Sequence, residues 1–108
     1  MRVKNIYADT GRPQDPGREY TEDLLAVQDL RIERIISRGH VSPPDFWYEQ
    51  QTNEWVLVAR GRASLEFEGG RMVHLAEGDC LFLPAGMKHR VTYTSKNPEC
   101  TWVAVHFP

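Results

Sequence analysis

Two short stretches of this sequence combine glycine spacing with side chains that can do chemistry. In the first, Glu54 is followed by six residues and then Gly61. The second reads GDCLFLPAGMKH and runs from Gly78 to His89. Carboxylate and imidazole groups are common proton carriers and metal ligands in proteins. We therefore expect Glu54 and His89 to mark a functional site if the fold brings them together.

The second stretch predicts a corner between two strands. Its opening glycine permits a tight turn, and Asp79 can hydrogen-bond its own backbone there. Pro84 cannot donate to a β ladder, so the apolar run before it should end at this point. Gly86 then allows the chain to turn back into the fold. This corner would deliver His89 to the inside of the protein at the start of the next strand.

The residues after Leu30 have the composition and the period-two alternation of strands. Turn signals rich in Gly, Pro and Asn separate eight such runs. Regular spacing of short strands predicts an all-β antiparallel sandwich or small barrel. The runs are RIERIIS, DFWYEQ, EWVLVAR, ASLEFE, RMVHL, CLFL, HRVTYT and TWVAVHF.

The first thirty residues have a different character. Residues 1–20 are polar and rich in Gly and Pro, which predicts an extended arm. A short helix is predicted within Tyr20–Leu30, because Thr21 could cap it and Leu24 is among the residues that supply an apolar side. We therefore expect an N-terminal arm and short helix over residues 1–30, and a β-barrel over residues 31–108.

Length, charge and hydropathy exclude several classes of function. A chain of 108 residues forms one domain. The net charge is −2 and the basic residues are scattered, so no nucleic-acid partner is expected. No window approaches the roughly 18 apolar residues of a membrane span, so no membrane partner is expected either. The two cysteines lack C-x-x-C spacing, and the N-terminus has no apolar signal core, so we expect a cytoplasmic protein.

The two stretches together resemble the two sequence motifs of the cupins. The first cupin motif is G-x5-H-x-H-x3–4-E-x6-G, and the second is G-x5-P-x-G-x2-H-x3-N. The second motif matches here up to His89, and the likeness extends from Arg31 to Phe107. The chain is most similar to small single-domain bacterial cupins with a conserved barrel of the cupin 2 type. The resemblance implies a double-stranded β-helix, which is a jelly-roll barrel.

The chain departs from the cupin pattern at the metal ligands. The H-x-H positions hold Tyr48 and Gln50, or Trp47 and Glu49 if the gap is one residue longer. The asparagine that closes the second motif is replaced by Tyr93. Neither alignment supplies the two histidines that cupins commonly use to bind a metal.

Two chemistries remain open for the residues that are left. Gln50, Glu54 and His89 could hold a divalent transition metal such as zinc, iron, nickel or manganese. Alternatively, Glu54 and His89 could form an acid–base pair without a metal, with Tyr48 as a further catalytic acid or base.

The resemblance implies a cupin that binds a small molecule inside its barrel. It would be a metal-dependent or acid–base enzyme of isomerase, lyase or dioxygenase type, acting on a small polar metabolite. The alternative is a non-catalytic sensor or carrier that binds a small ligand without metal. Phe46, Tyr48 and His106 are predicted to line the pocket, and the resemblance also implies a homodimer.

Overall fold

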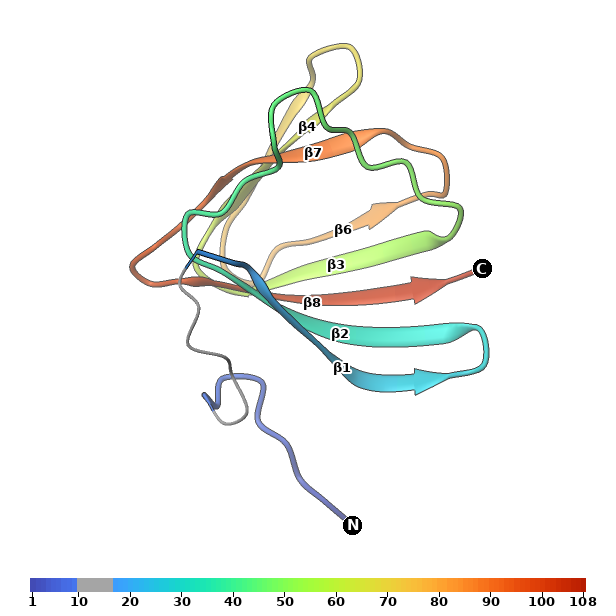
Figure 1. The fold of residues 1–108 in the computed structure, drawn as a ribbon, viewed down its shortest axis with the longest axis vertical. Helices are drawn as coiled ribbons and strands as arrows, with labels where there is room; N and C mark the ends of the chain where they lie inside the picture. Colours follow the sequence, from blue (N-terminus) through green and yellow to red (C-terminus); the bar gives the residue numbers. More distant parts are fainter. Residues whose placement is uncertain (10–16) are drawn as a thin grey trace.

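The computed structural model describes residues 1–9 and 17–108. Two antiparallel sheets face each other and form an all-β jelly-roll barrel, as predicted (Figure 1). One sheet has the strand order β1-β2-β8-β3-β6, and the other has the order β5-β4-β7. The strands are β1 (Tyr20–Val27), β2 (Leu30–Ser37), β3 (Asn53–Arg60), β4 (Ala63–Phe67), β5 (Met72–Leu75), β6 (Cys80–Leu83), β7 (His89–Thr94) and β8 (Cys100–Phe107).

The helix predicted within residues 20–30 is wrong, because this stretch forms β1 and the turn into β2. The two strands pair from Tyr20, opposite Ile36, to Val27, opposite Leu30. Asp29 has a φ of 64° in the connecting turn, a conformation that Asp tolerates better than most residues. A short helix is marginal on its own, whereas β1 pairs with β2 along its length, with one irregularity between Asp23 and Leu25. The predicted boundary between residues 30 and 31 stays a prediction.

The predicted strand at DFWYEQ is also wrong. Residues 45–50 cross the rim of the barrel and touch the sheet through a single bridge between Tyr48 and His89. In that bridge, each residue donates its backbone N–H to the other's carbonyl, at 2.7 and 3.0 Å. The aromatic side chains of this segment therefore belong to the rim of the barrel and not to a strand of either sheet.

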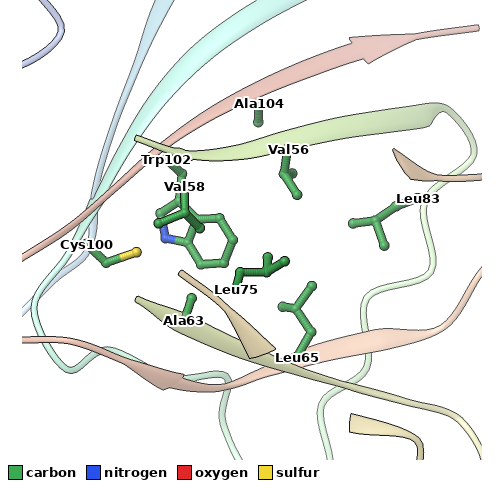
Figure 2. Close-up of a cluster of buried hydrophobic side chains, with 9 residues drawn as sticks. All are labelled: Val56, Val58, Ala63, Leu65, Leu75, Leu83, Cys100, Trp102 and Ala104. Atoms are coloured by element: carbon green, nitrogen blue, oxygen red, sulfur yellow. The ribbon is translucent and has the colours of Figure 1, made fainter. Parts of the chain in front are cut away.

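The core lies between the two sheets and is formed by inward-facing residues of five strands (Figure 2). The Trp102 indole N–H donates to Ser37 Oγ at 3.3 Å, which satisfies its one polar group inside the core. The core side chains are Val56, Val58, Ala63, Leu65, Leu75, Leu83, Cys100, Trp102 and Ala104.

The corner predicted around the second motif is present. Asp79 caps the turn before β6, since its carboxylate accepts the Ala76 N–H at 2.7 Å. After β6, Gly86 adopts a φ of 81°, and its N–H donates to the Gln50 carbonyl at 2.8 Å. This contact fixes the corner against the rim segment. The strand that follows begins at His89, which is 6% exposed.

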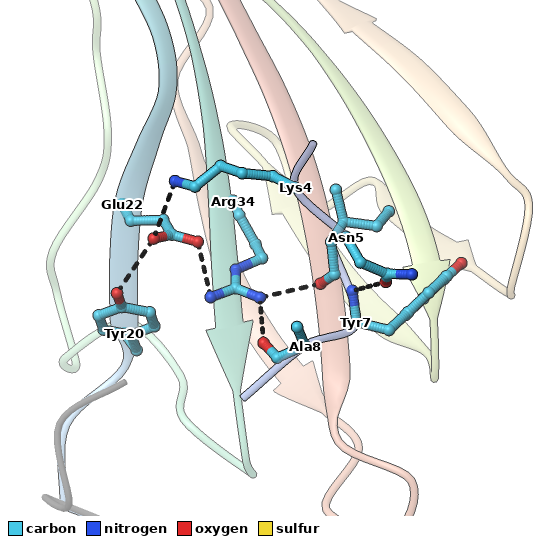
Figure 3. Close-up of polar contacts among 8 residues, drawn as sticks. Lys4, Asn5, Tyr7, Ala8, Tyr20, Glu22 and Arg34 are labelled. Carbon is cyan, nitrogen blue, oxygen red and sulfur yellow. Dashed lines mark hydrogen bonds and ion pairs between the residues drawn. The ribbon is translucent and has the colours of Figure 1, made fainter. Parts of the chain in front are cut away.

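The N-terminal arm covers part of the outer face of the five-stranded sheet (Figure 3). Beneath it lies Arg34 of β2, which is 2% exposed. Its guanidinium donates to the backbone carbonyls of Ile6 and Ala8, at 3.1 and 2.6 Å, and pairs with Glu22 at 2.6 Å. The arm is therefore held through its main chain by a buried cation.

Across residues 1–9 and 17–108, the fold has no helix whose length and hydropathy would let it cross a membrane.

Candidate functional site

A cavity of about 210 Å³ opens between the two sheets. Its floor is apolar and shares residues with the core, while its rim is polar. Five of the six predicted site residues line the cavity, and Phe46 is the one that does not. The lining residues are Glu19, Thr21, Arg31, Glu33, Ile35, Tyr48, Gln50, Glu54, Val56, Leu65, Leu83, His89, Val91, Trp102 and His106.

The sheet register places several polar residues in one row across the cavity wall. His106 of β8 pairs with Glu54 of β3 on one side and with Arg31 of β2 on the other. Directly opposed residues in antiparallel strands project from the same face. The three side chains therefore all face the cavity, together with Leu83, which continues the row.

Glu54 is the buried acid of this wall, with 7% of its surface exposed. Its Oε2 lies 3.9 Å from Nε2 of His106. Burial raises the pKa of Glu54, and the nearby Glu33 carboxylate raises it further. His106, His89 and Arg31 oppose that rise without cancelling it. A carboxylate with a raised pKa is a stronger base than an ordinary glutamate, and it can take a proton and later return it.

His106 is held by a carboxylate that sequence reasoning did not identify. Its Nε2 lies 2.7 Å from Glu33 Oε1, and Glu33 belongs to β2. Because an ionised carboxylate can only accept, we assign the proton of this contact to Nε2. His106 therefore bridges two acids, with Glu33 in hydrogen-bond contact and Glu54 farther away.

His89 presents one ring nitrogen to the site and uses the other for anchoring. Its Nδ1 lies 3.0 Å from the carbonyl of Met87, which can only accept a hydrogen bond. We therefore assign the proton of the neutral ring to Nδ1, which leaves a lone pair on Nε2. Tyr48 stacks on this imidazole, with ring centroids 5.6 Å apart and planes 24° apart.

Tyr48 is a hydrogen-bond donor rather than a base in this setting. Burial raises the pKa of Tyr48, and the Glu19 and Glu54 carboxylates raise it further, while a hydrogen bond with Ser42 lowers it. Its phenol therefore keeps its proton at neutral pH. Phe46 packs edge-on behind Tyr48 at 4.9 Å and is 46% exposed, so it supports Tyr48 from outside the cavity.

The donor set does not fit a tightly held metal ion. Catalytic zinc sites commonly use three protein ligands. Within the described ranges 1–9 and 17–108, no three His, Cys, Asp or Glu side chains are grouped closely enough to hold one. His89 and Glu54 are the strong donors at the predicted metal position, and Gln50 can add only an amide oxygen.

Comparison with known proteins identifies the family. The sequence model of the Cupin domain family matches residues 34–106, and the chain therefore belongs to the cupin family. None of the curated proteins compared with the chain matches it.

Solved structures show the same barrel. A protein from Ralstonia eutropha JMP134, provisionally named as a mannose-6-phosphate isomerase, is 40% identical with a TM-score of 0.90. That match covers 99% of this chain and 98% of the other. The EutQ protein of Clostridium difficile is 21% identical, with a TM-score of 0.68, over 87% of this chain and 74% of the other. A cupin superfamily protein from Desulfitobacterium hafniense DCB-2 is 16% identical, with a TM-score of 0.73, over 99% and 98% of the two chains.

Proposed function

We propose that this cupin is an isomerase that moves a proton between neighbouring carbons of a small polar metabolite bearing a carbonyl group. The observation that supports this most directly is the buried Glu54 carboxyl, which faces the cavity, has a raised pKa and feels the charge of two imidazoles. The provisional name of the 40% identical Ralstonia protein points to the same class of reaction.

Glu54, Tyr48 and His89 each have a separate role in the proposed reaction. Glu54 takes a proton from the carbon beside the carbonyl, and the released electron pair forms the carbon–carbon double bond of an enediolate as the π electrons of the carbonyl move onto its oxygen. Tyr48 donates a hydrogen bond to that oxygen, and His89 Nε2 carries a proton from one substrate oxygen to the other. Glu54 then returns its proton to the neighbouring carbon. The product has the same atoms as the substrate.

This function is tested by hydrogen exchange in D2O. The chain is incubated with a panel of aldoses and ketoses, and NMR follows the C–H signal next to the carbonyl. Wild-type protein should incorporate deuterium into at least one sugar, because a proton held on Glu54 exchanges with solvent. The Glu49→Gln variant is a matched control, since Glu49 is exposed and does not line the cavity. It should exchange at the wild-type rate.

Two other results would each favour a different function. Sugar binding without exchange would favour the non-catalytic sensor or carrier. Exchange that is lost on dialysis against a chelator and restored by zinc, iron, nickel or manganese would favour a metal-dependent enzyme. In that case Gln50, Glu54 and His89 would hold a weakly bound ion, and metal content should fall in His89→Ala. The isomerase proposed here should keep its activity after dialysis.

We further propose that the protein is a homodimer that pairs through the outer face of the five-stranded sheet. One row of this face is apolar across four strands, from Ile32 through Val105 and Trp55 to Phe82. Phe82 is 50% exposed and stacks on Phe107, with ring centroids 6.1 Å apart. The other three side chains of the row are half-buried, and an apolar row that reaches solvent in this way is typical of protein interfaces.

Light scattering tests this dimer. Wild-type protein should have twice the chain mass of 12.5 kDa, and Phe82→Lys should shift it towards the monomer by burying a charge in the interface. Tyr93→Lys is the matched control, because Tyr93 is 45% exposed on the other sheet. A wild-type monomer at high protein concentration would contradict the proposal.

A further inference from the structure

The cavity has an excess of acidic groups around its rim. Three carboxylates line it, from Glu19, Glu33 and Glu54. Among the described lining residues, the guanidinium of Arg31 is the only arginine or lysine group. A ligand inside the cavity therefore meets more negative than positive side chains.

The one guanidinium is itself balanced by acids. Arg31 lies 3.9 Å from Asp23 through Nε and 3.9 Å from Glu33 through a terminal nitrogen. Its side chain is 48% exposed, so solvent weakens its field further. Arg31 is therefore poorly placed to compensate the charge of an anionic ligand such as a phosphate ester.

Two of the carboxylates approach the same atom, Nε2 of His106. Glu33 Oε1 lies 2.7 Å from His106 Nε2, and Glu54 Oε2 lies 3.9 Å from the same atom. Glu33 is engaged by that contact, whereas the Glu54 side chain has no hydrogen-bond donor among residues 1–9 and 17–108. Buried carboxylates need donors, and an ammonium group supplies three.

The rest of the cavity suits the same kind of ligand. Tyr48 and Trp102 provide aromatic surface in the lining, and aromatic faces attract cations. The volume of about 210 Å³ is below the roughly 300–1,000 Å³ of pockets for drug-sized molecules. The ligand should therefore be a small metabolite.

We propose that this cavity selects a small metabolite bearing a primary amine, with the ammonium group bound by Glu54 and Glu33. The inference rests on the proposed function for the identity of the site, and it adds the charge class of the substrate. It also means that the phosphorylated sugar in the provisional name of the Ralstonia protein is a poor ligand for this chain.

The test compares three sugars of the same ring size that differ in charge. Isothermal titration calorimetry measures the binding of glucosamine, glucose and glucose 6-phosphate at low salt and neutral pH, where much of the amino group is protonated and the raised pKa of Glu54 works least against the contact. Glucosamine should bind roughly 10- to 100-fold more tightly than glucose, since hydrogen bonds between charged groups are the strong ones. Glucose 6-phosphate should bind more weakly than glucose.

Two variants on one strand should shift this preference in opposite directions. Glu33→Gln keeps an oxygen for His106 but loses the charge, so the ratio of glucosamine to glucose affinity should fall several-fold. Arg31→Gln removes the opposing cation, so the same ratio should rise. Glu33→Gln keeps the shape of the side chain, Arg31→Gln shortens a half-exposed one, and circular dichroism checks that both variants fold.

The outcomes separate this proposal from the proposed function. Equal binding of the three sugars, tighter binding of glucose 6-phosphate, no binding of glucosamine, or a ratio unmoved in both variants would each overturn the amine preference. None of these results would affect deuterium exchange on neutral sugars. Conversely, selective glucosamine binding without exchange on any sugar would support the charge preference and contradict the proposed isomerase activity.

Discussion

The Glu54→Gln variant is expected to lose proton transfer while becoming more stable than the wild-type protein at neutral pH. Glutamine has the shape of glutamate but cannot accept the proton of a substrate carbon. General acid–base groups contribute roughly 10²- to 10⁴-fold to rates, so exchange should fall by that factor. The NMR assay in D2O measures this loss directly.

The gain in stability follows from the direction of the pKa shift. Burial raises the pKa of Glu54 above its value in the unfolded chain. The stability associated with the protonated group is fully present below the ordinary glutamate pKa of about 4.3, and it is lost as pH rises through the folded pKa. Glutamine does not titrate, so the variant avoids this loss.

Urea unfolding across the pH range checks the stability effect. The difference in free energy of unfolding between Glu54→Gln and wild type should move in favour of the variant as pH rises from about 4 to neutral. The exposed Glu49→Gln variant should show no such trend. A variant that retains wild-type exchange, or that loses stability relative to wild type as pH rises, would contradict the role given to Glu54.

The Arg34→Ala variant is expected to lose about 3 kcal/mol of unfolding free energy, towards the lower end of the range for breaking a buried ion pair. The substitution leaves Glu22 without its guanidinium and leaves the carbonyls of Ile6 and Ala8 without their donor. Glu22 keeps 21% of its side-chain surface exposed, so water relieves part of the cost. The loss is still large against the 5–15 kcal/mol that holds a typical domain.

Two further variants separate the causes of this loss. Arg38 is 40% exposed and pairs with Glu99 at a longer 3.7 Å, so Arg38→Ala should change stability by no more than about 0.5 kcal/mol. Arg34→Met keeps most of the hydrocarbon volume but removes the charge. A loss in Arg34→Met close to that in Arg34→Ala would assign the effect to the polar contacts. An Arg34→Ala protein as stable as wild type would show that the arm does not depend on this residue.

The sequence predicted the barrel better than it predicted the barrel's edge. The second motif contains three residues that favour turns or end strands, namely Asp79, Pro84 and Gly86. Each of them lies in the turn where the sequence pattern predicts it. β1 was mistaken for a helix because three apolar residues near Thr21 fit an amphipathic turn. The alternation of half-buried and exposed residues from Tyr20 to Leu24 has the period of a strand.

The candidate site was predicted only in part for the same reason. Glu54, His89 and His106 could be named from motif position and strand alternation. Glu33 could not, because its role depends on the register that places β2 beside β8. Glu19 lies just before the strand that was mistaken for a helix, so its approach to the cavity was hidden as well. Long-range pairing, rather than local pattern, assembles the acidic side of the site.

The apolar floor of the cavity has a consequence for how this protein can evolve. Val56, Leu65, Leu83 and Trp102 line the cavity and also belong to the core. Trimming one of them to admit a bulkier ligand would remove core packing, at a typical cost of 2–5 kcal/mol for a large-to-alanine change. The rim segment at residues 45–50 contributes no residue to this core, so substitutions there would not remove core packing. New specificities in this lineage should therefore arise first by changes at the rim, with the floor inherited almost unchanged.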